Sequence, residues 1–246
     1  MQNDKNFLGT APIGKLLLKL SIPTVIAQLI NMLYNVVDRI YIGHIPGEGS
    51  LALTGVGVCM PIIMIVTAFA ALISSGGAPR ASICMGKQDN KSAEQILGNC
   101  FSLQIVVSIV LTVVLLIWNK DLLMVFGASK NTLGYATDYM RIYALGTLFV
   151  QLTLGMNAFI TAQGFTTTSM VSVLIGAICN ITLDPVFIFV FNMGVKGAAL
   201  ATVLSQAIST IWVVVFLSGK KTQLHLRKKY MGLKPKVFLP CVALGL

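Results

Sequence analysis

Six long apolar runs constrain this chain more than any other feature of its sequence. Each run provides the roughly 20 mostly apolar residues that an α-helix needs to cross the hydrocarbon core of a membrane. The runs lie at Leu16–Gly43, Leu51–Ser75, Ala93–Trp118, Leu133–Ile160, Thr168–Phe191 and Val195–Leu217. The strands of a membrane β-barrel would be about ten residues long with alternating polarity, and these runs have neither property. The sequence therefore predicts an all-α polytopic membrane protein with six transmembrane helices.

The composition excludes several other classes of protein. Of the 246 residues 56% are hydrophobic and 11% are charged, whereas soluble domains carry about 25% charged residues. Disorder requires low hydrophobicity and is excluded as well. The net charge of +10 does not indicate a nucleic-acid partner in so apolar a chain. The predicted partner is the lipid bilayer, and the odd number of cysteines, 5, predicts neither a disulfide framework nor a metal site.

Turn residues and basic residues predict the boundaries and the orientation of the spans. Gly- and Pro-containing segments at 43–47, 76–79 and 192–194 predict turns after the first, second and fifth spans. With the N-terminus in the cytoplasm, all but five of the 18 Lys and Arg residues lie on the cytoplasmic side, as the positive-inside rule requires. The five exceptions are Arg39, Lys120, Lys130, Arg141 and Lys196. We expect a multi-pass protein of the cell (plasma) membrane with a cytoplasmic N-terminus.

The end of the sequence predicts a longer arrangement than six helices. Residues 1–217 form the predicted six-helix transmembrane lobe, and residues 218–236 form a basic cytoplasmic linker. Residues 237–246 are apolar but too few to span a core of about 30 Å at about 1.5 Å per residue. We interpret them as the truncated start of a seventh transmembrane helix.

The first span carries a polar stripe that ends in a carboxylate. At about 100° per residue, six polar side chains fall on one face of this helix. They are Ser21, Thr24, Gln28, Asn31, Asn35 and Asp38. Lipid cannot satisfy such a row of polar groups, so this face should look into protein or a water-filled cavity. Hydrogen bonding between helices is the alternative role for each amide taken singly.

The second intramembrane carboxylate is Asp184, in the fifth span. Asn180 precedes it by one helical turn and shares its face. Pro185 has no N–H to donate to the carbonyl of Ile181, which predicts a kink and a free carbonyl oxygen. Carboxylate, amide and carbonyl oxygens suit an alkali cation such as Na⁺ at Asp38, Asn180 and Asp184, or a proton-holding site. A kinked helix whose buried acid is satisfied by its neighbours is the structural alternative.

Two further polar groupings are weaker signals. The sixth span carries Thr202, Gln206 and Ser209 on one side. Asp138 and Arg141, three residues apart at the start of the fourth span, predict a local ion pair rather than a site.

Several ordered segments resemble one family of transporters. Residues 20–43, which contain Asn35-Val-Val-Asp38-Arg39, resemble the first helix of the MATE (multidrug and toxic compound extrusion) family. The family pattern continues in order through the remaining spans. Its further segments are Leu53-Thr-Gly-Val-Gly57, Asn157-Ala-Phe159, Gln163-Gly164, Asn180-Ile-Thr-Leu-Asp-Pro185 and Gly197-Ala-Ala-Leu-Ala-Thr202. The resemblance covers nearly the whole chain and is nearest to bacterial multidrug-export members.

The resemblance implies half of a twelve-helix fold, namely its N-terminal six-helix lobe. It implies a secondary antiporter that exports small cationic amphiphilic drugs in exchange for Na⁺ or H⁺, without any cofactor and without enzyme activity. The coupling residues carried over by motif are Asp38, Asn180, Asp184 and Thr202. The expected cavity-lining residues are Gln28, Asn31, Asn35, Asn157 and Gln206. A C-terminal lobe is the implied partner. The chain has Thr161 where family members often carry Arg.

Three other functions share parts of this sequence pattern. A lipid-linked oligosaccharide flippase of the same superfamily would need cations deep in its spans to attract a diphosphate, whereas the deep charges here are two acids. A half-transporter fragment would insert without transporting. An intramembrane aspartyl protease would also place two Asp in separate spans, but the sequences around Asp38 and Asp184 do not match that class.

Overall fold

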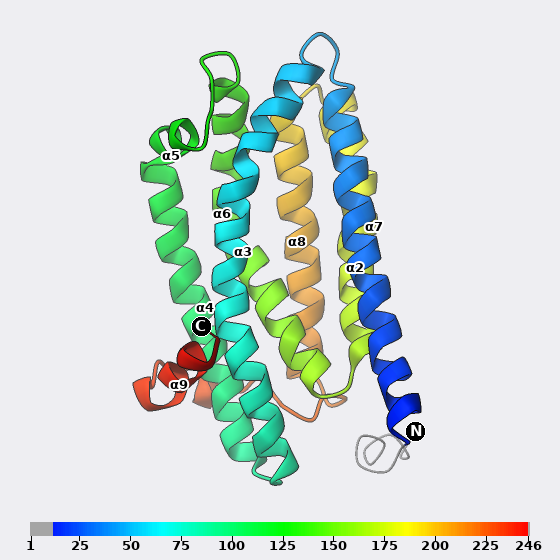
Figure 1. Cartoon of the computed structure of the whole chain (residues 1–246), viewed down its shortest axis with the longest axis vertical. Helices are drawn as coiled ribbons and strands as arrows, with labels where there is room; N and C mark the ends of the chain where they lie inside the picture. The colour runs from blue at the N-terminus through cyan, green and yellow to red at the C-terminus, as the bar shows by residue number, and fades with distance from the viewer. Residues whose placement is uncertain (1–11, 246) are drawn as a thin grey trace.

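Six long helices lie side by side along the long axis of the molecule (Figure 1). The computed structural model describes residues 12–245, so the outer ends of the predicted lobe and of the predicted seventh helix, residues 1–11 and 246, lie outside the described residues. All six helices are long and apolar enough to cross a membrane. They are α2 (Ile13–Gly43), α3 (Gly49–Gly86), α4 (Asn90–Ile117), α6 (Leu133–Ala162), α7 (Thr166–Pro185) and α8 (Val195–Ser218). The predicted all-α class with six spans is confirmed.

Four short elements complete the described part of the chain. They are α5 (Asn119–Val125), the π-helical turn η1 (Val186–Val190), the 3₁₀ turn η2 (Lys228–Tyr230) and α9 (Pro235–Gly245). The π-helical turn follows Pro185 directly, which agrees with the predicted disturbance of the fifth span, because proline removes one hydrogen bond of the helix.

The predicted turn at Gly76–Pro79 is wrong, because α3 continues without a break to Gly86. Apolar surroundings favour a continuous helix in which every backbone group can be paired, and they tolerate Gly and Pro within it. The actual turn lies at residues 87–89, where Gln88 has a φ of 60°. Asp89 then caps α4 by accepting a hydrogen bond from the backbone N–H of Ser92 at 3.0 Å. Hydrogen bonds from Ser92 hold the pKa of Asp89 below its usual value.

The bundle is organised around α6, which packs against α3, α4 and α8. Two apolar clusters fill the interior. One, which includes Ile42, Val56 and Met140, lies among α2, α3 and α6, and the other, which includes Leu97, Phe159 and Leu217, joins α4, α6 and α8. By contrast α2 packs mainly on α7 and has little contact with α3. The lobe therefore has a well-packed body and one peripheral helix.

The short helix α9 crosses α3 at very close range. A Cβ atom on Gly76 would collide with the carbonyl oxygen of Cys241, and a Cβ atom on Gly245 would collide with the carbonyl oxygen of Leu72. Small residues allow helix backbones to approach in this way. The guanidinium group of Arg80 also contacts the carbonyl oxygen of Val237, at 3.5 Å. Helix α9 is thus fixed along its length against the second half of α3.

We expect Gly76→Ala to displace α9 and to destabilise the protein by about 1–3 kcal/mol, because the added methyl group overpacks a backbone contact. Gly57→Ala, on the same helix, has open space around the new Cβ atom and serves as the control. Thermal unfolding in detergent measures stability, and maleimide labelling of the buried Cys241 measures the position of α9. Equal melting temperatures and equal labelling for the two variants would contradict this account of the crossing.

Candidate functional site

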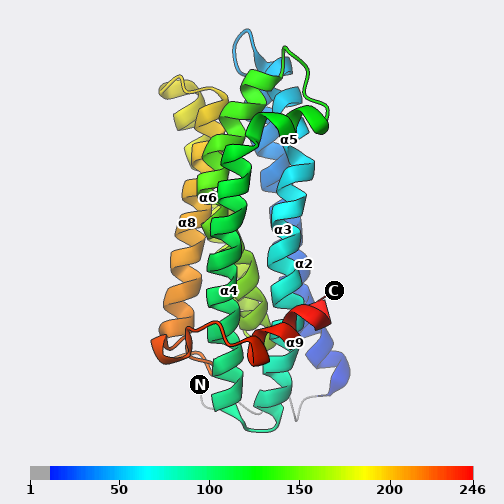
Figure 2. The same cartoon turned by 90° about the vertical axis from the view of Figure 1, so that its left-hand side faces the viewer.

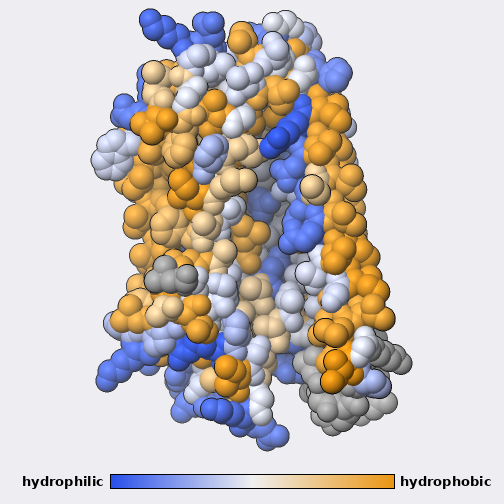
Figure 3. Space-filling view, viewed as in Figure 1, coloured by the Kyte–Doolittle hydropathy of each residue, from blue (hydrophilic) through white to orange (hydrophobic). Residues whose placement is uncertain are grey.

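A polar cavity of about 260 Å³ lies between α2 and the rest of the bundle. The space-filling view shows hydrophilic residues gathered in the space between α3 and α2, with apolar surface on both sides (Figure 3). Helix α2 lines the cavity with Asn31, Tyr34, Asn35 and Asp38. Helix α6 contributes Tyr139, Tyr143, Thr153 and Asn157, α7 contributes Gly176 and Asn180, and α8 contributes Thr202, Ser205, Gln206 and Ser209.

The predicted cavity-lining residues fall in two places. Asn31, Asn35, Asn157 and Gln206 line the polar cavity. Gln28 is exposed and instead lines a more open recess on the surface of α2, together with Thr24, Asn31 and Asn35. This recess is bounded by one helix only, so we place the candidate site in the cavity between the helices.

The four predicted coupling residues lie close to one another beside the cavity, and three of them, Asp38, Asn180 and Thr202, line it. The amide nitrogen of Asn180 donates to Asp184 Oδ1 at 3.3 Å and lies 3.5 Å from Thr202 Oγ1. The spacing of four residues aligns Asn180 and Asp184 on one face of α7, and the packing of α7 on α8 brings in Thr202. Asp38 of α2 lines the same cavity as Asn180 and Thr202 and interacts electrostatically with Asp184.

The same residues present oxygen atoms without partners. Asp184 is completely buried, and Asn180 and Asp38 are buried as well. Among the described groups, Asp38 Oδ1, Asn180 Oδ1 and Asp184 Oδ2 receive no hydrogen bond. Buried polar atoms normally have partners, so three such oxygens at one place call for a ligand that provides positive charge or a proton. Hard oxygen donors of this kind suit Na⁺.

Close packing between α7 and α8 builds the wall beside this site. A Cβ atom on Gly176 would lie 2.6 Å from Ser209 Oγ. The Ser209 hydroxyl donates to the carbonyl oxygen of Ser172 at 3.0 Å, and the Ser172 hydroxyl donates to Asn157 Oδ1 at 2.9 Å. These hydrogen bonds hold Asn157 of α6 in place at the cavity.

Two features of the site differ from the expectations or were absent from them. The ion pair of Asp138 is with Lys196 at 3.4 Å rather than with Arg141. Tyr139 and Tyr143 also line the cavity, with their rings stacked at a centroid distance of 6.3 Å. Their four-residue spacing in the fourth span was the available signal, because it places both rings on one helix face.

In residues 12–245 no three His, Cys, Asp or Glu side chains gather to hold a metal.

Comparison with known proteins now identifies the family. Residues 23–186 match the family described as MatE. This chain belongs to the MATE family. Members of the family are transporters, not enzymes, and need no cofactor. The resemblance seen in the sequence is therefore confirmed.

Individual relatives place the chain within the MATE family. It is 28% identical over 224 residues to the multidrug export protein MepA of Staphylococcus haemolyticus (strain JCSC1435), a match that covers 91% of this chain and 49% of the relative. It is 25% identical over 210 residues to MepA of Staphylococcus aureus (strain bovine RF122 / ET3-1), covering 85% of this chain and 46% of that protein. The chain thus spans about half the length of the curated relatives it matches.

Solved structures agree with the fold of half a MATE transporter. An outward-facing multidrug resistance MATE family transporter of the MOP superfamily superimposes with a TM-score of 0.86 and 25% identity, over 94% of this chain and 51% of that one. A MOP superfamily transporter from Pyrococcus furiosus gives a TM-score of 0.89 at 24% identity, over 98% of this chain and 53% of that one. The predicted N-terminal half of the MATE fold is confirmed.

We predict that the cavity admits water, which cysteine substitution can test. Asn157→Cys at the cavity should react with a hydrophilic methanethiosulfonate at least about tenfold faster than Val106→Cys, because the reacting thiolate forms in water and not in hydrocarbon. Val106 is 41% exposed on the outside of α4 and provides a lipid-facing control. Labelling is measured on the purified chain in lipid nanodiscs, with the unsubstituted chain as background. Similar rates at the two positions would mean that the cavity is dry.

Proposed function

We propose that this chain forms one lobe of a secondary antiporter that exports small cationic amphiphilic compounds in exchange for Na⁺ or H⁺. The observation that carries this proposal is the meeting of three unpartnered oxygens, from Asp38, Asn180 and Asp184, beside a polar cavity. The names of the relatives support this proposal, since both MepA proteins are multidrug export proteins.

The charge of the cavity favours a cationic substrate. Among its lining residues the only acidic or basic side chain is that of Asp38. A flippase that accepts a lipid diphosphate would need cations at this depth. Apolar and aromatic residues, including Met60, Ile63 and Tyr143, line the same cavity and suit the apolar part of an amphiphilic drug.

Coupling would follow from competition for the acidic pair. Two neighbouring buried carboxylates repel each other, and a proton or a bound Na⁺ relieves this repulsion. A cationic substrate near Asp38 relieves it in the same way. Each ligand therefore weakens the binding of the other, and an inward gradient of the coupling ion can release the drug on the outer side.

A second lobe would complete this machinery. Two polar residues of α2, Thr24 and Gln28, lie outside the cavity and line the open recess on the surface of this helix. The chain also spans about half the length of its relatives. We propose that a C-terminal lobe, supplied in cis, covers this side. On this proposal residues 218–236 form the linker and residues 237–246 begin the seventh helix, in the plasma membrane.

Neutralising either acid should abolish exchange. We expect Asp38→Asn and Asp184→Asn each to lower ion-driven drug export by at least about tenfold, because each removes a charged contact worth about 1.5–3 kcal/mol. Asp138→Asn removes an acid that is half exposed and pairs with Lys196, and it should leave export unchanged. Export of a fluorescent cation is measured in vesicles that contain the chain joined to a second MATE lobe. Undiminished export by either acid variant would refute the proposed coupling through the acidic pair.

We propose that the N-terminus and residues 218–236 lie in the cytoplasm, and labelling from outside the cell tests this orientation. A membrane-impermeant maleimide should label Lys130→Cys in intact cells and should label Lys221→Cys only after the membrane is opened. The unsubstituted chain measures background from the native cysteines. The reverse pattern would show that the N-terminus and the linker face the outside.

A further inference from the structure

The segment between α8 and α9 is a structured strap on the surface of the bundle. We define the strap as residues 219–234. It runs across α4, roughly perpendicular to the long helices, on the side of the bundle that faces the viewer in Figure 2. Side chains alternate along its first part, with Thr222, Leu224 and Leu226 buried. This alternation is the pattern of an extended chain with one face packed on protein.

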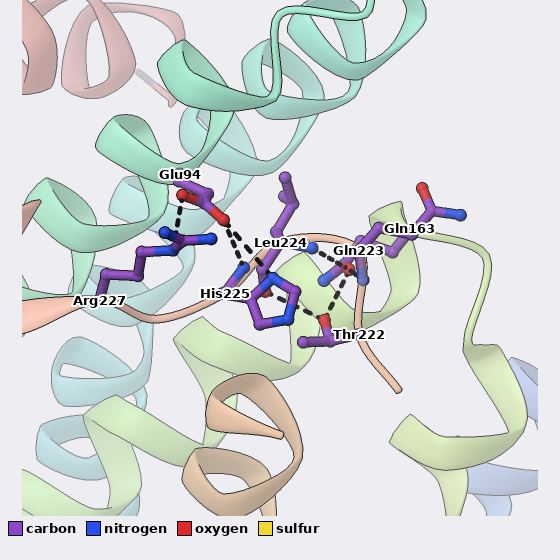
Figure 4. Close-up of polar contacts among 7 residues, drawn as sticks. All are labelled: Glu94, Gln163, Thr222, Gln223, Leu224, His225 and Arg227. Carbon is purple, nitrogen blue, oxygen red and sulfur yellow. Dashed lines mark hydrogen bonds and ion pairs between the residues drawn. The ribbon is translucent and has the colours of Figure 1, made fainter. Parts of the chain in front are cut away.

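Gln163, at the end of α6, holds the first part of the strap. Its single side-chain oxygen accepts hydrogen bonds from the Thr222 hydroxyl at 2.7 Å and from the backbone N–H groups of Gln223 and Leu224, both at 2.9 Å (Figure 4). One buried amide thus binds three consecutive residues of the strap.

Two residues of α4 hold the remainder. Glu94 Oε2 lies 3.1 Å from Arg227 Nε, and Glu94 Oε1 lies 3.5 Å from His225 Nδ1 (Figure 4). Further along, Asn99 Oδ1 accepts a hydrogen bond from the backbone N–H of Lys234 at 2.7 Å. Glu94 and Asn99 are both buried. The strap is therefore fixed at three places along its length.

The outward face of the strap is strongly basic. Residues 219–236, which comprise the strap and the first two residues of α9, contain no acid, and all their Lys and Arg side chains are exposed. These are Lys220, Lys221, Arg227, Lys228, Lys229, Lys234 and Lys236. Two apolar side chains, Met231 at 36% and Leu233 at 47% exposure, lie among these cations. Of the seven, Arg227 is the one that Glu94 neutralises.

We propose that the strap is a docking surface for the head groups of anionic phospholipids. Its position around a transmembrane bundle places the cations beside the lipids rather than in open solution, and each Lys or Arg near an anionic bilayer attracts it. Met231 and Leu233 would enter the boundary between head groups and acyl chains, as apolar residues of interfacial segments do. The fixed backbone presents these groups without the entropic cost of ordering a loose linker.

The purified chain in detergent micelles provides the test, with phosphatidylglycerol and phosphatidylcholine as probes and native mass spectrometry as the readout. We expect phosphatidylglycerol to be retained preferentially. Lys228→Gln with Lys229→Gln should weaken its binding about tenfold or more. Lys120→Gln with Lys130→Gln removes the same charge at the opposite end of the bundle and should leave this binding unchanged. Met231→Ser with Leu233→Ser should weaken it without any change in charge.

Three results would overturn the proposal. One is equal retention of the two lipids by the unsubstituted chain, and another is an equal loss of phosphatidylglycerol binding in the two lysine variants. The third is displacement of phosphatidylglycerol by glycerol phosphate at equal concentration, which would identify a site for soluble phosphate instead of lipid. Circular dichroism and thermal unfolding check that each variant keeps its fold.

Discussion

The hydrocarbon core of a membrane offers no partner to a polar group, and the structure of this lobe depends on that constraint. Every spanning segment is helical, because a helix pairs its own backbone groups. Polar side chains must turn toward one another or toward water, and here many of them line one cavity between α2 and the bundle. Asp38, Asn180 and Asp184 each have a buried oxygen without a partner beside this cavity. An arrangement that is costly in an apolar medium is understandable where a cation or proton completes it.

The sequence was sufficient for features that depend on length and helical spacing. Apolar runs predicted all six spans, and four-residue spacing placed Asn180 and Asp184 on one face of α7. The polar stripe of the first span was only partly predictive. The last three residues of the stripe, Asn31, Asn35 and Asp38, line the cavity, whereas Gln28 lines an open recess. Periodicity gives the face of a helix, but the neighbouring helices decide how much of that face is enclosed.

Other features could not be predicted because they depend on contacts between distant residues. The sequence around Gly76 and Gly77 predicted a turn, yet both residues lie within the unbroken helix α3. Gly76 allows α9 to cross α3 at close range. Local sequence does not distinguish these two uses of glycine. The strap was identified only as a basic linker, since the acceptors that order it, Gln163, Glu94 and Asn99, come from α6 and α4. Likewise Asp138 pairs across to α8 rather than with its neighbour on α6.

The two sides of the lobe are anchored unequally, and this bears on how a cavity in it could change shape. The strap and the crossing of α3 with α9 join the second core cluster through buried hydrogen bonds and backbone contacts. Helix α2 forms one wall of the polar cavity, yet it packs mainly on α7. Movement of α2 breaks fewer contacts than movement of any helix of the body, and Asp38 moves with it. Because α7, on which α2 mainly packs, carries Asp184, the packing of these two helices sets the distance between the two acids, and a bound cation or proton acts on that distance by relieving the repulsion between them.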